Sequence, residues 1–179
     1  TFTVSSEKGE FLEFPEGSLV YATKGTVFYI DSYQQGSSDK HVGTDRRIHL
    51  IMGELFFDVQ PANEGFNVIC ANAKTTVFGT QFYVGTQPGS NRFTVVAVRE
   101  GQVFVEKIGK SQLGSTRLKA DQGTRIVTRD GNVTLMPPIT MRSMNPLMQR
   151  LNAFNLARSD RKVRSLLSKP GVNVMDGII

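Results

Sequence analysis

Few side chains in this sequence could do acid–base or metal chemistry, and they are not grouped. The chain has two histidines, His41 and His49, and one cysteine, Cys70. A metal site in a small β-barrel needs a His-x-His pair, a third histidine and a carboxylate, all close enough to share one ion. The sequence lacks that pattern, so we predict no metal and no cofactor. We expect both histidines to be solvated or hydrogen-bonded.

Glu54 and Asp58 are four residues apart in a predicted strand and therefore share a face. Their separation would be about 13 Å, whereas the paired carboxylates of glycoside hydrolases lie about 5 to 9.5 Å apart. Glu54 directly follows Gly53, where we expect its side chain to accept backbone hydrogen bonds in a turn. The sequence also lacks a Gly-x-Ser-x-Gly elbow, a phosphate-binding loop and a Cys-x-x-Cys pair. We therefore predict that the protein is not an enzyme.

The elements that would position these residues are short strands punctuated by glycine. Between residues 53 and 105 the runs GELFFDV, FNV, VFGTQFYV and EGQVFV alternate with the period of a β-strand. In the first run Leu55, Phe57 and Val59 fall on one face. Pro61 and the turn at residues 63–65 predict that this run and FNVIC form a hairpin-like pair.

The glycines recur at intervals of 22 to 28 residues, which suggests an internal repeat. The repeated positions are Gly25, Gly53, Gly79, Gly101 and Gly123, and three places after each stands an aromatic residue or isoleucine: Phe28, Phe56, Phe82, Phe104 and Ile126. Two architectures fit this pattern, a β-solenoid-like body of stacked units and an antiparallel sandwich whose strands share a composition. Both are all-β, with about 10–13 short strands.

The same runs form an ordered pattern: Gly-Glu-x-x-Phe-x-Val, Phe-x-Val, Gly-Thr-x-Phe-x-Val and Glu-Gly-x-Val-x-Val. In its order, spacing and residue types it resembles the FecR domain, a family named for the ferric-citrate regulator. The resemblance covers residues 46–123 most clearly, within a predicted β domain of residues 1–140. The residues that carry it are Gly53, Glu54, Phe57, Val59, Phe66, Val68, Gly79, Thr80, Phe82, Val84, Glu100, Gly101, Val103 and Val105.

The resemblance implies a bacterial extracytoplasmic domain, periplasmic in the regulator that gives the family its name, which binds other proteins. In that regulator the domain senses a signal from a TonB-dependent outer-membrane receptor and passes it through a membrane helix to an anti-sigma segment. The implied role is therefore signal relay to a sigma factor, or assembly in the envelope. The expected partner is a protein, such as a receptor's signalling domain, and not a nucleic acid.

Two further features bear on location. No apolar run approaches the roughly 20 residues that a membrane-spanning helix requires, so we predict no membrane span in this chain. No signal peptide is visible and the first residue is threonine, so we expect a processed or excised piece of a longer protein.

The excess positive charge lies at the end of the chain. Residues 1–140 hold 14 basic and 14 acidic side chains, so the formal charge of +5 comes from residues 141–179. Asn145 and Pro146 predict the start of a helix, and residues 141–179 therefore suggest a basic, short helical tail. We expect partner contacts in this tail, at Arg150, Phe154, Arg158, Arg161, Lys162 and Arg164.

Two other interpretations of the tail stay open. It could pack on its own domain, with its apolar stripe against the β body. Alternatively, the chain could be an exported scaffold module that binds cell-wall glycan or another anionic polymer through these basic residues, in which case binding would weaken steeply with salt.

Overall fold

The computed structural model describes residues 1–14, 16–31, 46–61, 65–109 and 114–144, together with Leu147, Gln149, Arg150 and Phe154. In this part of the chain there are fourteen strands and one short 3-10 helix, η1 (Met141–Met144), which confirms the all-β prediction. Beyond η1, Leu147, Gln149, Arg150 and Phe154 have helical backbone, and the rest of the predicted tail lies outside the described residues. The strands are β1 (Phe2–Thr3), β2 (Glu10–Glu13), β3 (Leu19–Ala22), β4 (Val27–Ile30), β5 (Arg46–Val59), β6 (Phe66–Ile69), β7 (Ala73–Val77), β8 (Thr80–Gln87), β9 (Phe93–Glu100), β10 (Gln102–Lys107), β11 (Ser115–Lys119), β12 (Gln122–Arg129), β13 (Asn132–Leu135) and β14 (Ile139–Thr140).

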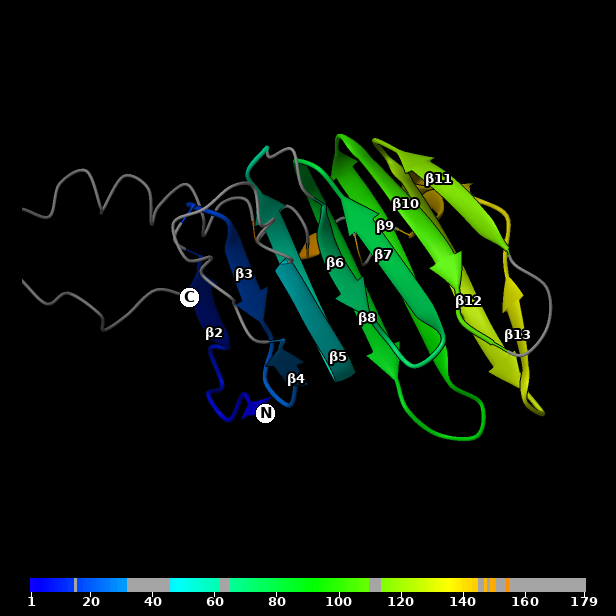
Figure 1. Cartoon of the computed structure of the whole chain (residues 1–179), viewed down its shortest axis with the longest axis horizontal. Coiled ribbons are helices and arrows are strands. Elements are labelled where there is room, and N and C mark those ends of the chain that lie inside the picture. The colour runs from blue at the N-terminus through cyan, green and yellow to red at the C-terminus, as the bar shows by residue number, and fades with distance from the viewer. Residues whose placement is uncertain are drawn as a thin grey trace, which may run out of the picture.

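The strands form two sheets that share the long strand β5. Sheet A has the order β1-β4-β5-β6-β7-β10-β11, and sheet B has the order β2-β3-β5-β8-β9-β12-β13, with β14 also paired to β12. The first half of β5 pairs in sheet A and its second half in sheet B. Figure 1 shows the strands crossing the body on the diagonal, from β2 and β3 on one side to β11 and β13 on the other.

The prediction of a hairpin-like pair between GELFFDV and FNVIC is wrong. β6 runs parallel to the first half of β5, with Arg46 opposite Phe66, whereas GELFFDV, in the second half of β5, pairs with β8. The reason is that β5 passes from one sheet to the other. After Val59 the chain returns to the start of β5. There β6 pairs with residues 46–49, which a hairpin with GELFFDV would not have reached.

The recurring glycines lie where the chain changes sheets. Gly25 lies between β3 and β4, Gly53 within β5, Gly79 between β7 and β8, and Gly101 between β9 and β10. All four have positive φ. The crossing from β11 to β12 has its positive φ at Asp121 (60°), two residues before Gly123. The glycine spacing therefore reflects the distance between corners of a two-layer body.

The residues three places after these glycines do not share one environment, which excludes a simple stack of identical units. Phe28, Phe82 and Ile126 are in the core between the sheets, whereas Phe56 lies on the outer face of sheet B and Phe104 is 37% exposed. The strand register shifts at Val27/Phe28 and at Gln81/Phe82. The extra residues are Ile51 on β5 and Arg99 on β9, since Phe28 pairs with Leu50 and Phe82 with Val98. A bulge turns the residues that follow it to the opposite face, so the bulge at Ile51 separates the inward Leu50 from the inward Leu55 and leaves Phe56 on the outer face.

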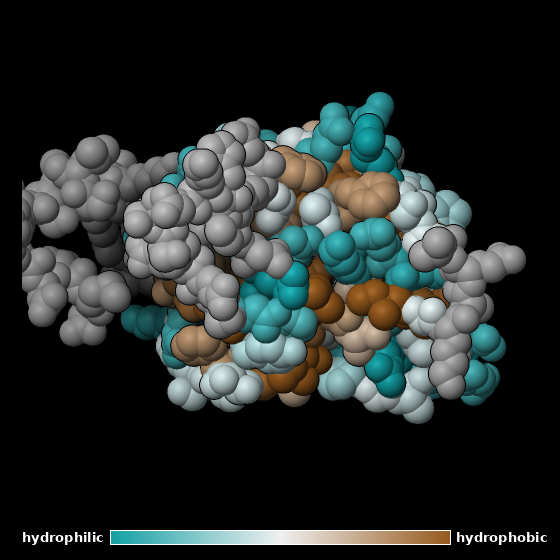
Figure 2. All heavy atoms as spheres, in the orientation of Figure 1, coloured by the Kyte–Doolittle hydropathy of each residue, from teal (hydrophilic) through white to brown (hydrophobic). Residues whose placement is uncertain are grey.

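One hydrophobic core lies between the two sheets. In the second half of β5 it takes Leu55, Phe57 and Val59, the face that the alternation predicts, and Phe57 stacks on Phe82 with ring centroids 4.4 Å apart. The remaining apolar residues of the FecR pattern are also fully buried there: Phe66, Val68, Val84, Val103 and Val105. Cys70 is buried as well, as expected for a lone cysteine. On the face shown in Figure 2, hydrophobic residues form several patches between hydrophilic ones.

Candidate functional site

A row of aromatic side chains crosses the outer face of sheet B. Phe11 on β2 lies opposite Tyr21 on β3, Tyr21 lies opposite Phe56 on β5, and Phe56 lies opposite Tyr83 on β8. We call these four residues the aromatic row. Neighbouring ring centroids along it are 4.8, 6.0 and 5.0 Å apart, the spacing of favourable aromatic pairs. The row exists because outward positions of four adjacent strands are in register.

The C-terminal segment covers this row. The Phe154 ring lies 6.4 Å from Phe11, 6.4 Å from Tyr21 and 5.7 Å from Phe56, centroid to centroid, and its side chain is only 4% exposed. Met141 is 1% exposed in the same cluster. Two large apolar side chains are thus removed from water. The burial of each stabilises the docked segment by roughly 1.5–3 kcal/mol relative to an exposed position.

Glu54 anchors the segment electrostatically. Arg150 donates from both terminal guanidinium nitrogens to the two oxygens of the Glu54 carboxylate, and its guanidinium carbon lies 5.8 Å from the centre of the Phe56 ring. The Tyr83 hydroxyl donates to Glu54 Oε1 at 3.0 Å, and the Thr23 hydroxyl reaches Oε2 at 3.5 Å. Bidentate pairing of this kind is both directional and stronger than a neutral hydrogen bond.

The expectation that the Glu54 side chain accepts backbone hydrogen bonds is wrong. It is the Glu54 backbone that is tied to the corner, because its N–H donates to Thr26 Oγ1 at 3.0 Å and its carbonyl accepts from the same hydroxyl at 3.1 Å. The carboxylate is left free to bind side chains on the outer face. Sequence reasoning could not show this, because the partners come from β3, β8 and the C-terminal segment.

The titration of this cluster does not suit acid–base catalysis near neutral pH. Burial, then the charge and hydrogen bond of Glu54, raise the pKa of Tyr83 well above its ordinary range. Burial lowers the pKa of Arg150, but hydrogen bonding to Glu54 and the nearby negative charge outweigh it, so the net pKa is raised. The phenol therefore stays protonated and the guanidinium charged, and the Glu54 carboxylate is occupied by both.

The other candidate chemical residues have separate partners. Asp58 is buried and accepts a hydrogen bond from Gln81 at 3.4 Å, so Glu54 and Asp58 do not act as one pair. His49 Nε2 lies 2.9 Å from Asp31 Oδ2, and the ring stacks on Tyr29 at 4.4 Å, so this histidine is hydrogen-bonded as expected. His41 lies outside the described residues.

No three His, Cys, Asp or Glu side chains of the described residues are close enough to hold a metal ion. Among the same residues there is also no helix whose length and hydropathy would suit a membrane crossing.

The structure divides the expected partner-binding residues into two groups. Arg150 and Phe154 pack on the β body, so this part of the tail follows the self-packing alternative. Four basic residues lie outside the described residues: Arg158, Arg161, Lys162 and Arg164. Phe11, Tyr21 and Tyr83 were not identified from the sequence, since only the strand register brings them together. The boundary at residue 140 stays a prediction.

The family model described as FecR protein matches residues 3–104. This chain belongs to the FecR family. The match begins at the N-terminal strands and ends in β10, so it contains the four corner glycines from Gly25 to Gly101 and all four residues of the aromatic row. No curated protein matches the sequence.

Two crystal structures of a protein from Parabacteroides distasonis are similar to this FecR domain. The assignment of that protein as an anti-sigma factor is provisional. One structure, at 1.65 Å resolution, matches with a TM-score of 0.60 and 21% identity over 82% of this chain and 63% of that one. The other, at 2.50 Å, has the same TM-score and identity over 80% and 62%. The likeness shows a shared fold, and this chain spans less than two thirds of the length of that protein.

Proposed function

We propose that this FecR domain is a non-enzymatic protein-interaction module of the bacterial envelope, on the periplasmic side, that takes part in relaying a signal to a sigma factor. Family membership and the fold shared with a provisionally assigned anti-sigma factor support a signalling role. The occupied, charge-compensated state of Glu54, Tyr83 and Arg150 supports binding rather than catalysis.

The observation that carries the proposal is the docking of the C-terminal segment on the aromatic row. Phe154 and Arg150 hold the start of the tail at a fixed place on a rigid sheet. A tail held in this way can present its next residues to a partner in one orientation, and less ordering entropy is then lost on binding. We assign the partner contact to Arg158, Arg161, Lys162 and Arg164, which implies an acidic surface on the partner.

The test uses the purified signalling domain of a TonB-dependent receptor whose gene neighbours that of this protein, the arrangement that the proposal predicts, titrated by calorimetry. The wild-type chain should bind it with one-to-one stoichiometry. A variant with Arg158, Arg161, Lys162 and Arg164 changed to Gln should lose binding while its circular dichroism and unfolding midpoint stay unchanged. The exposed Arg117, on β11, provides the control through Arg117→Gln, which should bind as the wild type does.

Two results would overturn the proposal. If the wild-type chain does not bind the receptor domain, or if no such receptor is encoded nearby, the signal-relay role is wrong. If the quadruple variant binds as tightly as the wild type, the tail is not the contact, and the partner surface must be on the β body.

A further inference from the structure

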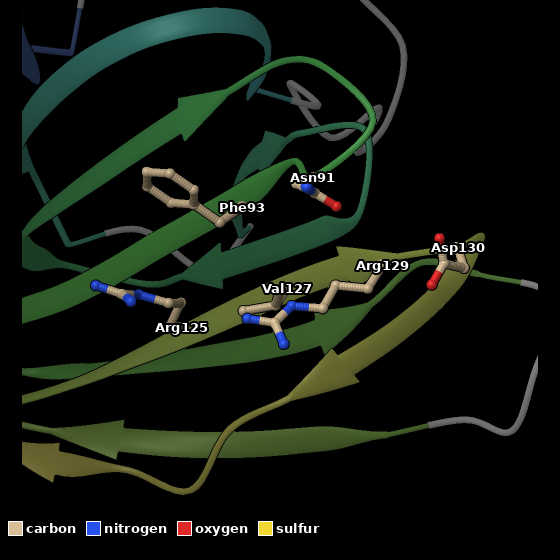
Figure 3. A pocket seen from close by; sticks show the side chains of 6 residues that line it. All are labelled: Asn91, Phe93, Arg125, Val127, Arg129 and Asp130. Atoms are coloured by element: carbon tan, nitrogen blue, oxygen red, sulfur yellow. The ribbon is translucent and has the colours of Figure 1, made fainter.

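The outer face of sheet B continues past the aromatic row, through Val95, to a surface that has no covering segment among the described residues. It is a hollow of about 420 Å³ between β9 and β12, lined by Asn91, Phe93, Arg125, Val127, Arg129 and Asp130. Figure 3 shows the two arginines on the same strand, with Phe93 on the neighbouring strand and Asn91 in the turn that precedes it. We call it the arginine groove.

The two guanidinium groups of the groove have no hydrogen bond or ion pair with a described residue. Arg125 lies over the Phe93 ring, 5.5 Å from its centre, and both arginine side chains are exposed. Figure 3 shows the Arg129 side chain running back along β12 toward Val127 and away from Asp130, which lies at the end of the groove. Asp130, the one carboxylate among the residues that line the groove, therefore does not neutralise the two arginines.

The residues of β9 and β13 that pair with Arg125, Val127 and Arg129 add no acidic group. Opposite Arg125 on β9 stands Val95, and opposite Val127 stands Phe93. On β13, Thr134 lies opposite Val127 and Asn132 opposite Arg129. Two positive charges thus face solvent across a neutral, partly apolar floor, an arrangement that favours an anionic ligand.

The spacing selects the kind of ligand. Arg125, Val127 and Arg129 are two residues apart along β12 and therefore share one face of the strand. The two arginine Cα atoms are about 13 Å apart. The two guanidinium groups lie at different places, Arg125 over the Phe93 ring and Arg129 toward Val127, so two separate acidic groups match them better than one phosphate or carboxylate does. An extended peptide has the same two-residue period. Acidic residues four places apart would meet the two arginines, and an apolar residue midway would lie on Val127 and Phe93.

We propose that the arginine groove binds an extended acidic segment of a protein, of the pattern acidic-x-apolar-x-acidic. Nucleic acid is a poorer fit, because residues 1–140 carry no net charge and the one aromatic ring of the groove already lies under Arg125. The inference rests on the proposed function to the extent that a protein partner supplies the segment. It adds a contact on the β body, separate from the tail.

The test needs no natural partner. The probe is the peptide Ser-Glu-Thr-Leu-Thr-Glu-Ser-amide with fluorescein on its N-terminal amine, titrated with the full chain by fluorescence anisotropy, and the control peptide has Gln in place of both Glu. Changing Arg125 and Arg129 together to Gln should weaken binding about tenfold, since each exposed ion pair contributes up to about 1 kcal/mol. Arg117→Gln should leave it unchanged. Raising the salt from about 50 to about 500 mM should weaken binding as well.

Localisation provides a second readout. Backbone amide shifts on addition of the peptide should change along β9 and β12, around Val95 and Val127, and not along β11. The groove proposal is overturned if the wild type does not bind the peptide, if the Gln peptide binds equally well, or if Arg117→Gln weakens binding as much as the double change. It is also overturned if inorganic phosphate or a single-stranded oligonucleotide competes at a lower concentration than unlabelled peptide. None of these results bears on the receptor-domain titration, so the two proposals fail separately.

Discussion

The guanidinium of Arg150 and the carboxylate of Glu54 form a two-point ion pair across 96 residues of sequence. Glu54 stands one residue after Gly53, the corner at which β5 changes sheets, so the C-terminal segment is tied to that corner. The pair is partly accessible, with 45% of the Arg150 side chain and 25% of the Glu54 side chain exposed.

A double-mutant cycle on this pair should give a coupling free energy of about 1 kcal/mol, because screening by solvent limits even a bidentate pair at this exposure. The cycle uses Arg150→Gln, Glu54→Gln and both together, with urea unfolding of the full chain as the measurement. Arg142→Gln, at an exposed arginine, is the matched control and should show no coupling with Glu54→Gln. Additive effects of the two central changes would contradict the pairing.

Phe154→Ala should release the C-terminal segment without unfolding the sheets. Loss of a buried ring that touches three other aromatic residues should weaken docking by about 2 kcal/mol, which corresponds to roughly thirtyfold faster tryptic cleavage after Arg150. Cleavage is followed by mass spectrometry at low protease concentration. Phe78→Ala, at a ring that is 58% exposed, should leave the cleavage rate unchanged. Equal rates for Phe154→Ala and the wild type would mean that the docking seen here does not persist in solution.

Gly53→Ala should be far more damaging than Gly25→Ala, although both glycines are at corners with positive φ. A Cβ at position 53 would lie 2.6 Å from Thr26 Cα, whereas at position 25 no atom lies within 4 Å. Backbone strain alone should cost Gly25→Ala about 1 kcal/mol, and the added clash should take Gly53→Ala to about 3 kcal/mol or more. Chemical unfolding of both variants measures the difference. Similar losses of stability in the two variants would contradict the close approach of Gly53 to Thr26 at this corner.

Stability should fall at alkaline pH through Tyr83. Burial and Glu54 raise the pKa of Tyr83 in the folded state, so the folded protein holds this proton more tightly than the unfolded chain. The resulting stabilisation is fully present below the unfolded pKa of about 10 and is lost as pH rises toward the folded pKa. Tyr83→Phe should remove this alkaline loss, as seen in unfolding midpoints measured across pH. Ultraviolet titration should show Tyr83 ionising later in the folded chain, and ionisation near pH 10 would contradict the buried hydrogen bond.

The fold could be predicted from the sequence wherever a rule acts locally. The alternation in GELFFDV correctly placed Leu55, Phe57 and Val59 inside, and the recurring glycines marked the corners. Pairing could not be predicted in the same way. The parallel arrangement of β5 and β6 depends on β5 being shared by two sheets, and the bulges at Ile51 and Arg99 leave no clear mark in the residue types.

The site was harder to predict than the fold. Arg150 and Phe154 were identified from helical spacing and charge, but their partners are distant in sequence. Tyr83, Tyr21 and Phe11 meet only because four strands are in register, and Glu54 follows a glycine whose conformation directs its side chain outward. Each of these contacts depends on register, which residue types alone do not fix.

The central claim is that a tail docked on the aromatic row presents the contact for a signalling partner. Its most direct test is calorimetric titration of the neighbouring receptor's signalling domain with the wild-type chain and with a variant that combines Arg150→Gln and Phe154→Ala. Neither of the two changed side chains is assigned to the partner contact, so the variant should weaken partner binding only because its tail is no longer docked. We predict at least about tenfold weaker binding by the variant with its sheets still folded; binding as tight as that of the wild type would contradict the claim.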